Sequence, residues 1–226
     1  IFQSDDGSGG VTPYLTLDGG YSTPQIIVPD SVNFNLGTGL DLALQHDGSN
    51  SFITNNVGNL TIKNNTDDGD IIFQSDDGSG GVETYFFLDG SAGSGTPITN
   101  FPDGSYLTFG ASQDLQIYHD GSNSYINGAG TGDLYIRNST DDESIIFQCD
   151  DGSGGVETYF ALEGVAGGAQ PFTVFPDSSV LSFGSGHDLR IEHTGSHSVI
   201  DNYVGNVIFT NNTDDGDIIF KSDNGS

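Results

Sequence analysis

Short apolar runs alternate with turn-forming residues along the whole chain. The intervening stretches, such as SDDGSGG and HDGSN, are rich in Gly, Asp, Asn and Ser. Apolar runs of this length, bounded by such residues, predict short β-strands joined by tight turns, and no helical period of useful length is present. The sequence therefore predicts an all-β fold. In the middle of the chain the predicted strands are IIFQ (71–74), VETYFFL (82–88), YLTFG (106–110), DLQIYH (114–119), SYI (124–126) and LYIR (134–137).

The same sequence motifs recur with a period of 73 or 74 residues. The Pro-Asp pair at Pro29 returns 73 positions later at Pro102, and again 74 positions later at Pro176. The twenty-residue stretches that begin at Ile71 and Ile145 differ at only 3 positions. Self-similarity of this kind indicates a tandem array of similar modules. The chain divides into three full repeats and the start of a fourth: 1–70, 71–144, 145–217 and 218–226.

The strand predicted at 82–88 carries bulky apolar side chains on both faces. Strict alternation puts Phe86 and Leu88 on one face and Tyr85 and Phe87 on the other. A strand that is apolar on both faces needs cover on both, which one thin module cannot supply. We therefore expect an elongated fibre shaft, a homotrimer in which other chains cover the second face, with a single-chain β-solenoid as the alternative. The residues expected to pack between chains are the recurring tyrosines Tyr14, Tyr85 and Tyr159.

Composition restricts the partners of the chain. Four Lys and Arg residues stand against 32 Asp and Glu, for a formal net charge of −28. Such a chain repels phosphate backbones, so we expect no nucleic-acid binding. No run of about 18 apolar residues exists, so we expect no membrane insertion. Glycine, at 34 of 226 residues, is about twice its usual ~7% share, which predicts thin modules rather than a thick core.

A histidine recurs at one position of the repeat, between a predicted strand and a glycine turn. A catalytic site is normally assembled once, so a residue that returns in every copy favours a structural role. We expect each imidazole to sit at a hairpin corner and to bond to backbone. One alternative is a metal or anion held on a threefold axis by symmetry-related copies, and another is plain surface exposure. The histidines are His46, His119 and His193.

Aspartates cluster with glycine in two recurring loops, SDDGSGG and NNTDDGD. Calcium takes six to eight oxygen ligands, and such loops can supply them. The spacing matches neither an EF-hand nor a nine-residue calcium repeat, and Asp and Asn also serve plain turns, which is the interpretation we favour. We expect no cofactor, with calcium as the one cation that these loops could bind. The candidate ligands are Asp67, Asp68, Asp70, Asp76, Asp77, Asp214, Asp215 and Asp217.

Nothing in the sequence marks an active site, and we expect no enzymatic activity from this chain. Glycoside hydrolysis needs two carboxyl groups about 5 to 10 Å apart with different roles. Asp pairs recur here in register, so no pair is distinguished from the others. No phosphate-binding loop is present, because no lysine follows DDGSGG.

One sequence motif resembles segments of known proteins. DLQIYHDGSNSYI (114–126), followed by GTGDLYIRN (130–138), is similar to repeat segments of tail-fibre and other virion structural proteins of marine bacteriophages. The likeness extends over each full repeat. It implies an extracellular virion appendage, usually a homotrimer, that reaches glycans on the host surface. The third repeat departs from the motif at Thr194 and His197.

These observations together predict a structural role. We expect the shaft of a phage tail fibre or similar virion appendage, which holds a host-receptor-binding tip away from the particle. The chain starts at Ile1 without methionine, so we expect it to be part of a longer protein whose tip lies outside it. Two alternatives stay open: a bacterial extracellular filament or adhesin built from the same repeats, and a calcium-binding β-solenoid.

Overall fold

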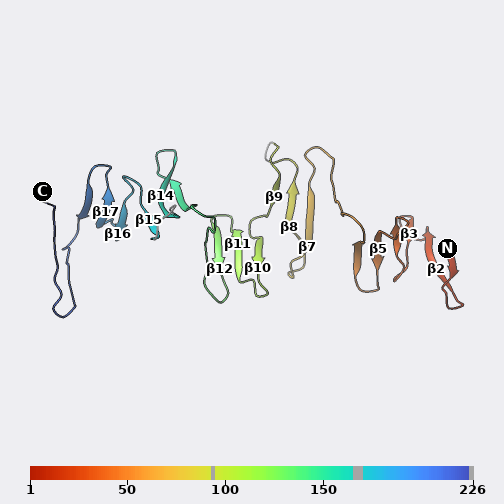
Figure 1. Cartoon of the computed structure of the whole chain (residues 1–226). Coiled ribbons are helices and arrows are strands. Elements are labelled where there is room, and N and C mark those ends of the chain that lie inside the picture. Colours follow the sequence, from red (N-terminus) through yellow and green to blue (C-terminus); the bar gives the residue numbers. More distant parts are fainter. Residues whose placement is uncertain (93–94, 165–169, 224–226) are drawn as a thin grey trace. The chain divides into compact units, whose positions relative to one another are not determined.

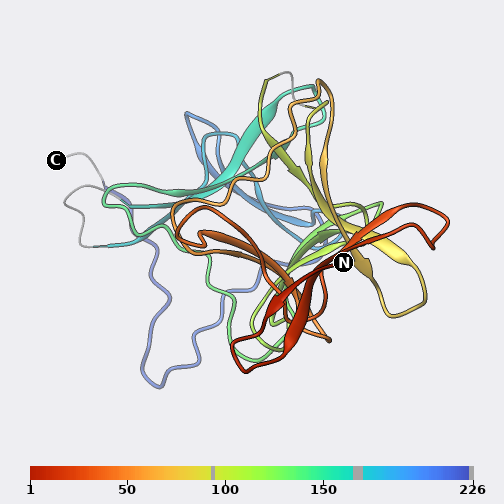
Figure 2. The ribbon, with the colours of Figure 1, turned by 90° about the vertical axis from the view of Figure 1, so that its right-hand side faces the viewer.

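The computed structural model describes residues 1–92, 95–164 and 170–223. This part of the chain is all-β, as predicted. It contains 18 strands in six separate sheets of three, and every sheet is an antiparallel meander. No coiled ribbon is drawn for the described residues in either view (Figure 1, Figure 2). They include no helix long and apolar enough to cross a membrane.

Each full repeat folds into two meanders of three strands, and Figure 1 shows the meanders following one another along the chain. The first has a long central strand, and its members are β1 (Phe2–Asp5), β2 (Val11–Asp18) and β3 (Gln25–Ile27); β7 (Ile71–Asp76), β8 (Val82–Asp89) and β9 (Ile98–Asn100); β13 (Ile145–Asp150), β14 (Val156–Glu163) and β15 (Phe172–Val174). The second comprises β4 (Phe34–Leu36), β5 (Leu42–His46) and β6 (Ser51–Asn55); β10 (Tyr106–Phe109), β11 (Leu115–His119) and β12 (Ser124–Gly128); β16 (Leu181–Phe183), β17 (Leu189–His193) and β18 (Ser198–Asn202). The tandem repeat of the sequence is thus a tandem repeat of structure.

Strand pairing is entirely local in the described residues. Each strand pairs only with its neighbours in sequence, and the substantial contacts between elements are all within one sheet. A solenoid would instead pair a strand with its counterpart in the next repeat. The single-chain β-solenoid alternative therefore does not describe this structure.

A β-bulge interrupts the central strand of each first meander. Phe73 pairs with Phe86 and Gln74 with Thr84, so Tyr85 is an extra residue without a partner in the β7–β8 ladder. Tyr159 and Tyr14 hold the same position in β14 and β2. An extra residue on one strand resets the alternation of side chains between the two faces. Strict alternation through 82–88 was therefore a wrong prediction.

The strand predicted at LYIR (134–137) is absent. Residues 132–139 have no regular secondary structure, and the same holds for the equivalent stretches 60–65 and 206–212. The strand-like composition was identified correctly, but a strand exists only where a second backbone is there to pair with it. In the described residues, none of the six sheets includes any of these stretches.

The described residues have almost no core. Ala161, at 8% exposure, is the one apolar residue among them that is buried. The chain exposes 18008 Å², whereas a compact monomer of 23.7 kDa exposes about 9,800 Å². Contacts group the chain into two units, Ile1–Thr131 and Gly132–Ser226, and neither is a globule around a hydrophobic centre. Three-stranded meanders of this size bury little apolar surface by themselves.

Candidate functional site

The recurring histidines lie at the ends of the central strands of the second meanders. His119 and Ser124 face each other across the β11–β12 hairpin, with 3.0 Å between Nδ1 of the imidazole and Oγ of the serine. The same pair forms at His46 and Ser51 (3.1 Å) and at His193 and Ser198 (3.2 Å). The imidazole thus bonds to a serine hydroxyl, and the backbone partner that the sequence suggested is not the one observed.

The backbone of each histidine joins the two meanders of its repeat. The N–H of Gly104, in the turn that follows Pro102-Asp103, donates to the carbonyl of His119 over 2.8 Å. Ser31 and Ser178 donate in the same way to His46 and His193. This bond fixes the start of the second meander against the turn that leaves the first. The geometry is that of a structural corner in all three repeats.

The candidate metal ligands are used in turns. Asp76 accepts from the N–H of Gly78 (2.6 Å), and Asp77 accepts from both the N–H and the hydroxyl of Ser79. Asp68 and Asp215 adopt left-handed backbone conformations, with φ of 59° and 57°, at equivalent turns that also contain Asp67 and Asp214. In the described residues no three His, Cys, Asp or Glu side chains are arranged to hold a metal ion. Calcium binding by these loops stays a prediction.

Two further candidates, Asp70 and Asp217, lie where one repeat meets the next. The carboxylate of Asp70 accepts a hydrogen bond from the N–H of Gly90 over 2.9 Å, and its carbonyl accepts one from the side chain of Asn64. The carbonyl of Asp217 accepts the equivalent bond from Asn211. The Asp70 bond connects the NNTDDGD loop to the end of β8, so this loop positions the first meander that follows it.

The three tyrosines predicted to pack between chains are the bulge residues of the first meanders. Each hydroxyl donates across its own hairpin to a backbone carbonyl: Tyr85 to Asp76 over 3.0 Å, with Tyr14 and Tyr159 donating to Asp5 and Asp150 over 3.3 Å. Their rings remain close to half exposed. The hydroxyl therefore has a role within the chain, while much of each ring surface is available to a partner.

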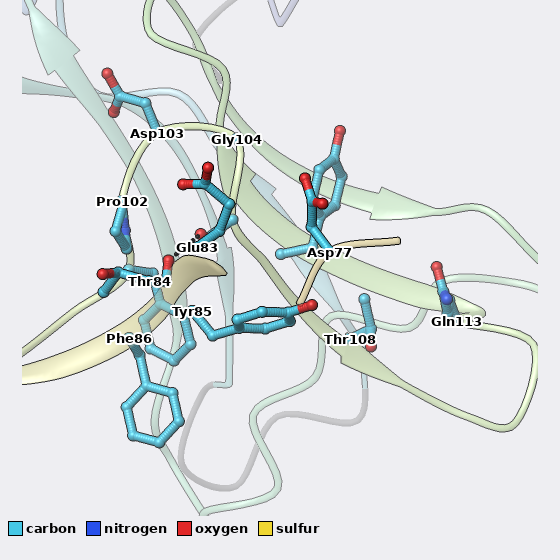
Figure 3. Close-up of a pocket in the computed structure, with 13 residues that line it drawn as sticks. Asp77, Glu83, Thr84, Tyr85, Phe86, Pro102, Asp103, Gly104, Thr108 and Gln113 are labelled. Carbon is cyan, nitrogen blue, oxygen red and sulfur yellow. Dashed lines mark hydrogen bonds between the residues drawn. The ribbon is translucent and has the colours of Figure 1, made fainter. Parts of the chain in front are cut away.

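A cleft of about 560 Å³ lies between the two meanders of the second repeat. Figure 3 shows the carboxylates of Asp77, Glu83 and Asp103 above the rings of Tyr85 and Phe86. Ser105 closes one wall by donating to the carbonyl of Thr84. The combination of carboxylates and ring faces can bind polyhydroxylated or cationic groups by hydrogen bonding and stacking.

One carboxylate of this cleft, that of Asp77, is not tuned for acid catalysis. A general acid that works near neutral pH needs a raised pKa. The pKa of Asp77 is lowered instead, because the hydroxyl and the N–H of Ser79 both donate to its carboxylate. Asp77 is therefore a turn residue that stays ionised at neutral pH.

A ladder of three tyrosines in the second repeat was missed from the sequence. Tyr106, Tyr118 and Tyr125 lie in register across β10–β12, with ring centroids 4.2 Å and 4.7 Å apart. Such stacking stabilises adjacent strands. A comparison of the three repeats could have revealed the ladder, because only the second repeat has tyrosine at these three positions. The equivalent residues are Asn33, Gln45 and Phe52 in the first repeat and Val180, Glu192 and Val199 in the third.

The ladder gives a pH-dependent prediction. The pKa of Tyr125 is raised because its hydroxyl donates to the carboxylate of Asp120, 3.0 Å away. A raised pKa in the folded state stabilises the protein below the ordinary tyrosine pKa of about 10, and this stabilisation is lost as pH rises through the folded value. We expect Tyr125→Phe to flatten the decline of the melting temperature above pH 9. An unchanged slope between pH 9 and 11 would contradict this role of the bond.

Comparisons of the whole chain with protein families, with curated proteins and with solved structures found no match to any of them.

Proposed function

We propose that this chain is a segment of a structural shaft, a homotrimer in a phage tail fibre or similar virion appendage. Its function would be to hold a receptor-binding tip, outside this segment, at a distance from the particle and close to host glycans. The site of action would be extracellular. The resemblance of residues 114–138 to virion repeats supports this assignment, as does the regular alternation of two meanders along the chain.

The observation that carries the proposal is that residues 1–92, 95–164 and 170–223 have almost no core. The chain exposes 18008 Å², about 8,000 Å² more than a compact monomer of its mass. Large apolar side chains of every repeat are among the exposed residues, and extensive exposed apolar surface marks a place where other chains bind. Obligate assemblies bury about 2,000 to 5,000 Å² at an interface and resemble a core divided between chains. A homotrimer would supply this cover at every repeat, since each repeat exposes equivalent side chains.

A bacterial extracellular filament or adhesin would have the same physical properties. It shares the mechanical role, and the genomic context of the coding sequence distinguishes the two. The calcium-dependent alternative has less support, because in the described residues the aspartates satisfy turn N–H groups and form no group of metal ligands.

The first test is the mass in solution. We expect light scattering at micromolar concentration to give three times 23.7 kDa, unchanged after treatment with a calcium chelator. A folded monomer would contradict the shaft proposal. Dissociation or unfolding in chelator would instead show that the acidic loops bind a cation and that assembly depends on it.

A further inference from the structure

We infer that the three unpaired apolar segments of the chain are interchain β-strands, each pairing through its backbone with an open sheet edge in another copy of the chain. The inference deepens the proposed homo-oligomer and rests on it, because it names the segments that join the copies. We call them the linker strands, and they are residues 60–63 (LTIK), 134–137 (LYIR) and 207–210 (VIFT).

Their backbone forms no ladder with any other part of the chain that the structure describes. None of the three segments belongs to a sheet of the described residues, and no backbone hydrogen bond there joins them to another segment. Nearly all backbone polar groups in folded proteins are paired with protein or with water. A segment of apolar and β-branched residues that leaves its whole ladder unpaired is a template for strand addition.

Their side chains are also largely exposed, although the ring of Phe209 contacts that of Phe220 edge-on, with 6.1 Å between the centroids. Tyr135 and Ile208 are 82% and 77% exposed, and the flanking Leu134 and Phe209 are 48% and 60% exposed. Leu60 and Ile62 of the first repeat, the counterparts of Leu134 and Phe209, have similar exposures, whereas the counterpart of Tyr135 and Ile208 there is Thr61.

Charge favours a second copy of this chain as the occupant. With 32 acidic residues, copies would repel one another wherever carboxylates meet. The linker strands contain no acidic residue, and neither do the residues directly after them, through Thr66, Thr140 and Thr213. Two of the four basic residues of the chain, Lys63 and Arg137, end the first two linker strands. These are the stretches where an acidic partner can approach closely and be attracted.

The sheets have open edges with which the linker strands of another copy could pair. Every described sheet has three strands in an open meander, so its two outer strands each leave one side of the backbone unpaired. Strand addition between copies would satisfy these edges and the linker strands together. It would also recur at each repeat, because the segments and the sheets share the same period.

The test combines amide hydrogen exchange with a matched pair of variants in the full chain. We expect amides 134–137 to exchange at least about 100-fold more slowly in the assembled protein than an unpaired amide does. Tyr135→Pro removes one N–H from the ladder, whereas Tyr135→Thr keeps the N–H and the β-strand preference. Tyr135→Pro should raise the midpoint concentration of association about tenfold and remove the protection locally. Tyr135→Thr should retain the protection.

The outcomes separate this inference from the proposed function. A trimer in which amides 134–137 exchange freely, or in which Tyr135→Pro assembles as the wild type does, overturns the linker-strand inference and leaves the shaft proposal standing. A monomer overturns both. Protection that persists at concentrations where the protein is monomeric overturns the inference as well, because the pairing would then lie within one chain.

Discussion

Alanine in place of Gly90 is expected to destabilise the second repeat by about 2 kcal/mol, the cost typical of inserting a methyl group where there is no space. A Cβ on Gly90 would lie 2.5 Å from the carbonyl oxygen of Gly69, and that oxygen belongs to backbone that cannot rotate away. The N–H of Gly90 is held at the same place by Asp70. The substitution therefore forces the NNTDDGD loop away from the end of β8. Urea denaturation, monitored by circular dichroism, measures the loss.

The repeat itself provides the control. Gly19 is the counterpart of Gly90 in the first repeat, and nothing lies within 4 Å of a Cβ built there. Neither glycine has a positive φ, so alanine is tolerated by the backbone at both. Gly19→Ala should be neutral or stabilise the fold by up to about 1 kcal/mol through the unfolded chain. Gly164→Ala should behave as Gly90→Ala does, because its Cβ would lie 2.7 Å from the carbonyl oxygen of Glu143. Equal effects at Gly19 and Gly90 would exclude this packing explanation.

Much of the fold could be predicted because its contacts are local. A meander is specified by apolar runs and by the turns between them, and both are visible within about thirty residues of sequence. The turn at His119-Asp120-Gly121 is an example: Asp120 accepts the N–H groups of Ser122 and Asn123, as an Asp-Gly hairpin turn requires.

The errors arose where a residue depends on a partner that the pattern does not reveal. The bulge at Tyr85 depends on how β7 aligns with β8, and alternation along one strand carries no information about that alignment. LYIR (134–137) has the composition of a strand, but pairing needs a second backbone, which the chain does not supply in the described residues. The same dependence suggests why this segment is a candidate for assembly between copies.

The candidate site was predicted less well than the fold. The recurrence of the histidines predicted a structural corner but not the partner of the imidazole. Ser124 lies five residues after His119, and only the register of the hairpin shows that the two face each other. For the Asp-rich loops the sequence allowed two roles. Asp77 and Ser79 form a turn that needs no ligand, but the same residues could also bind a cation, so composition alone does not distinguish a turn from a cation site.

Phe86 is expected to be the most sensitive side chain of the second repeat. Its ring stacks on Phe73 at 4.5 Å and on Phe101 at 5.7 Å, which ties together β7, β8 and the turn after β9. Phe86→Ala removes both stacking interactions and the apolar surface that the ring buries against Phe73 and Phe101, at a cost of about 3 kcal/mol. Phe160→Ala should cost a similar amount, because Phe160 stacks on Phe147 and Phe175 at 4.4 Å and 5.9 Å.

The first repeat shows which part of this cost is due to stacking. Leu15 occupies the equivalent position there, opposite Phe2 in the ladder. Phe86→Leu should therefore keep the fold and cost only about 1 kcal/mol, since apolar volume is largely retained while ring stacking is lost. Native-state hydrogen exchange resolves the effect by sheet: protection should fall in β7–β9 and hold in β10–β12, because few contacts link the two meanders. If Phe86→Ala lowered the protection of both sheets equally, the meanders would be one cooperative unit, and the local character of the fold would not extend to its stability.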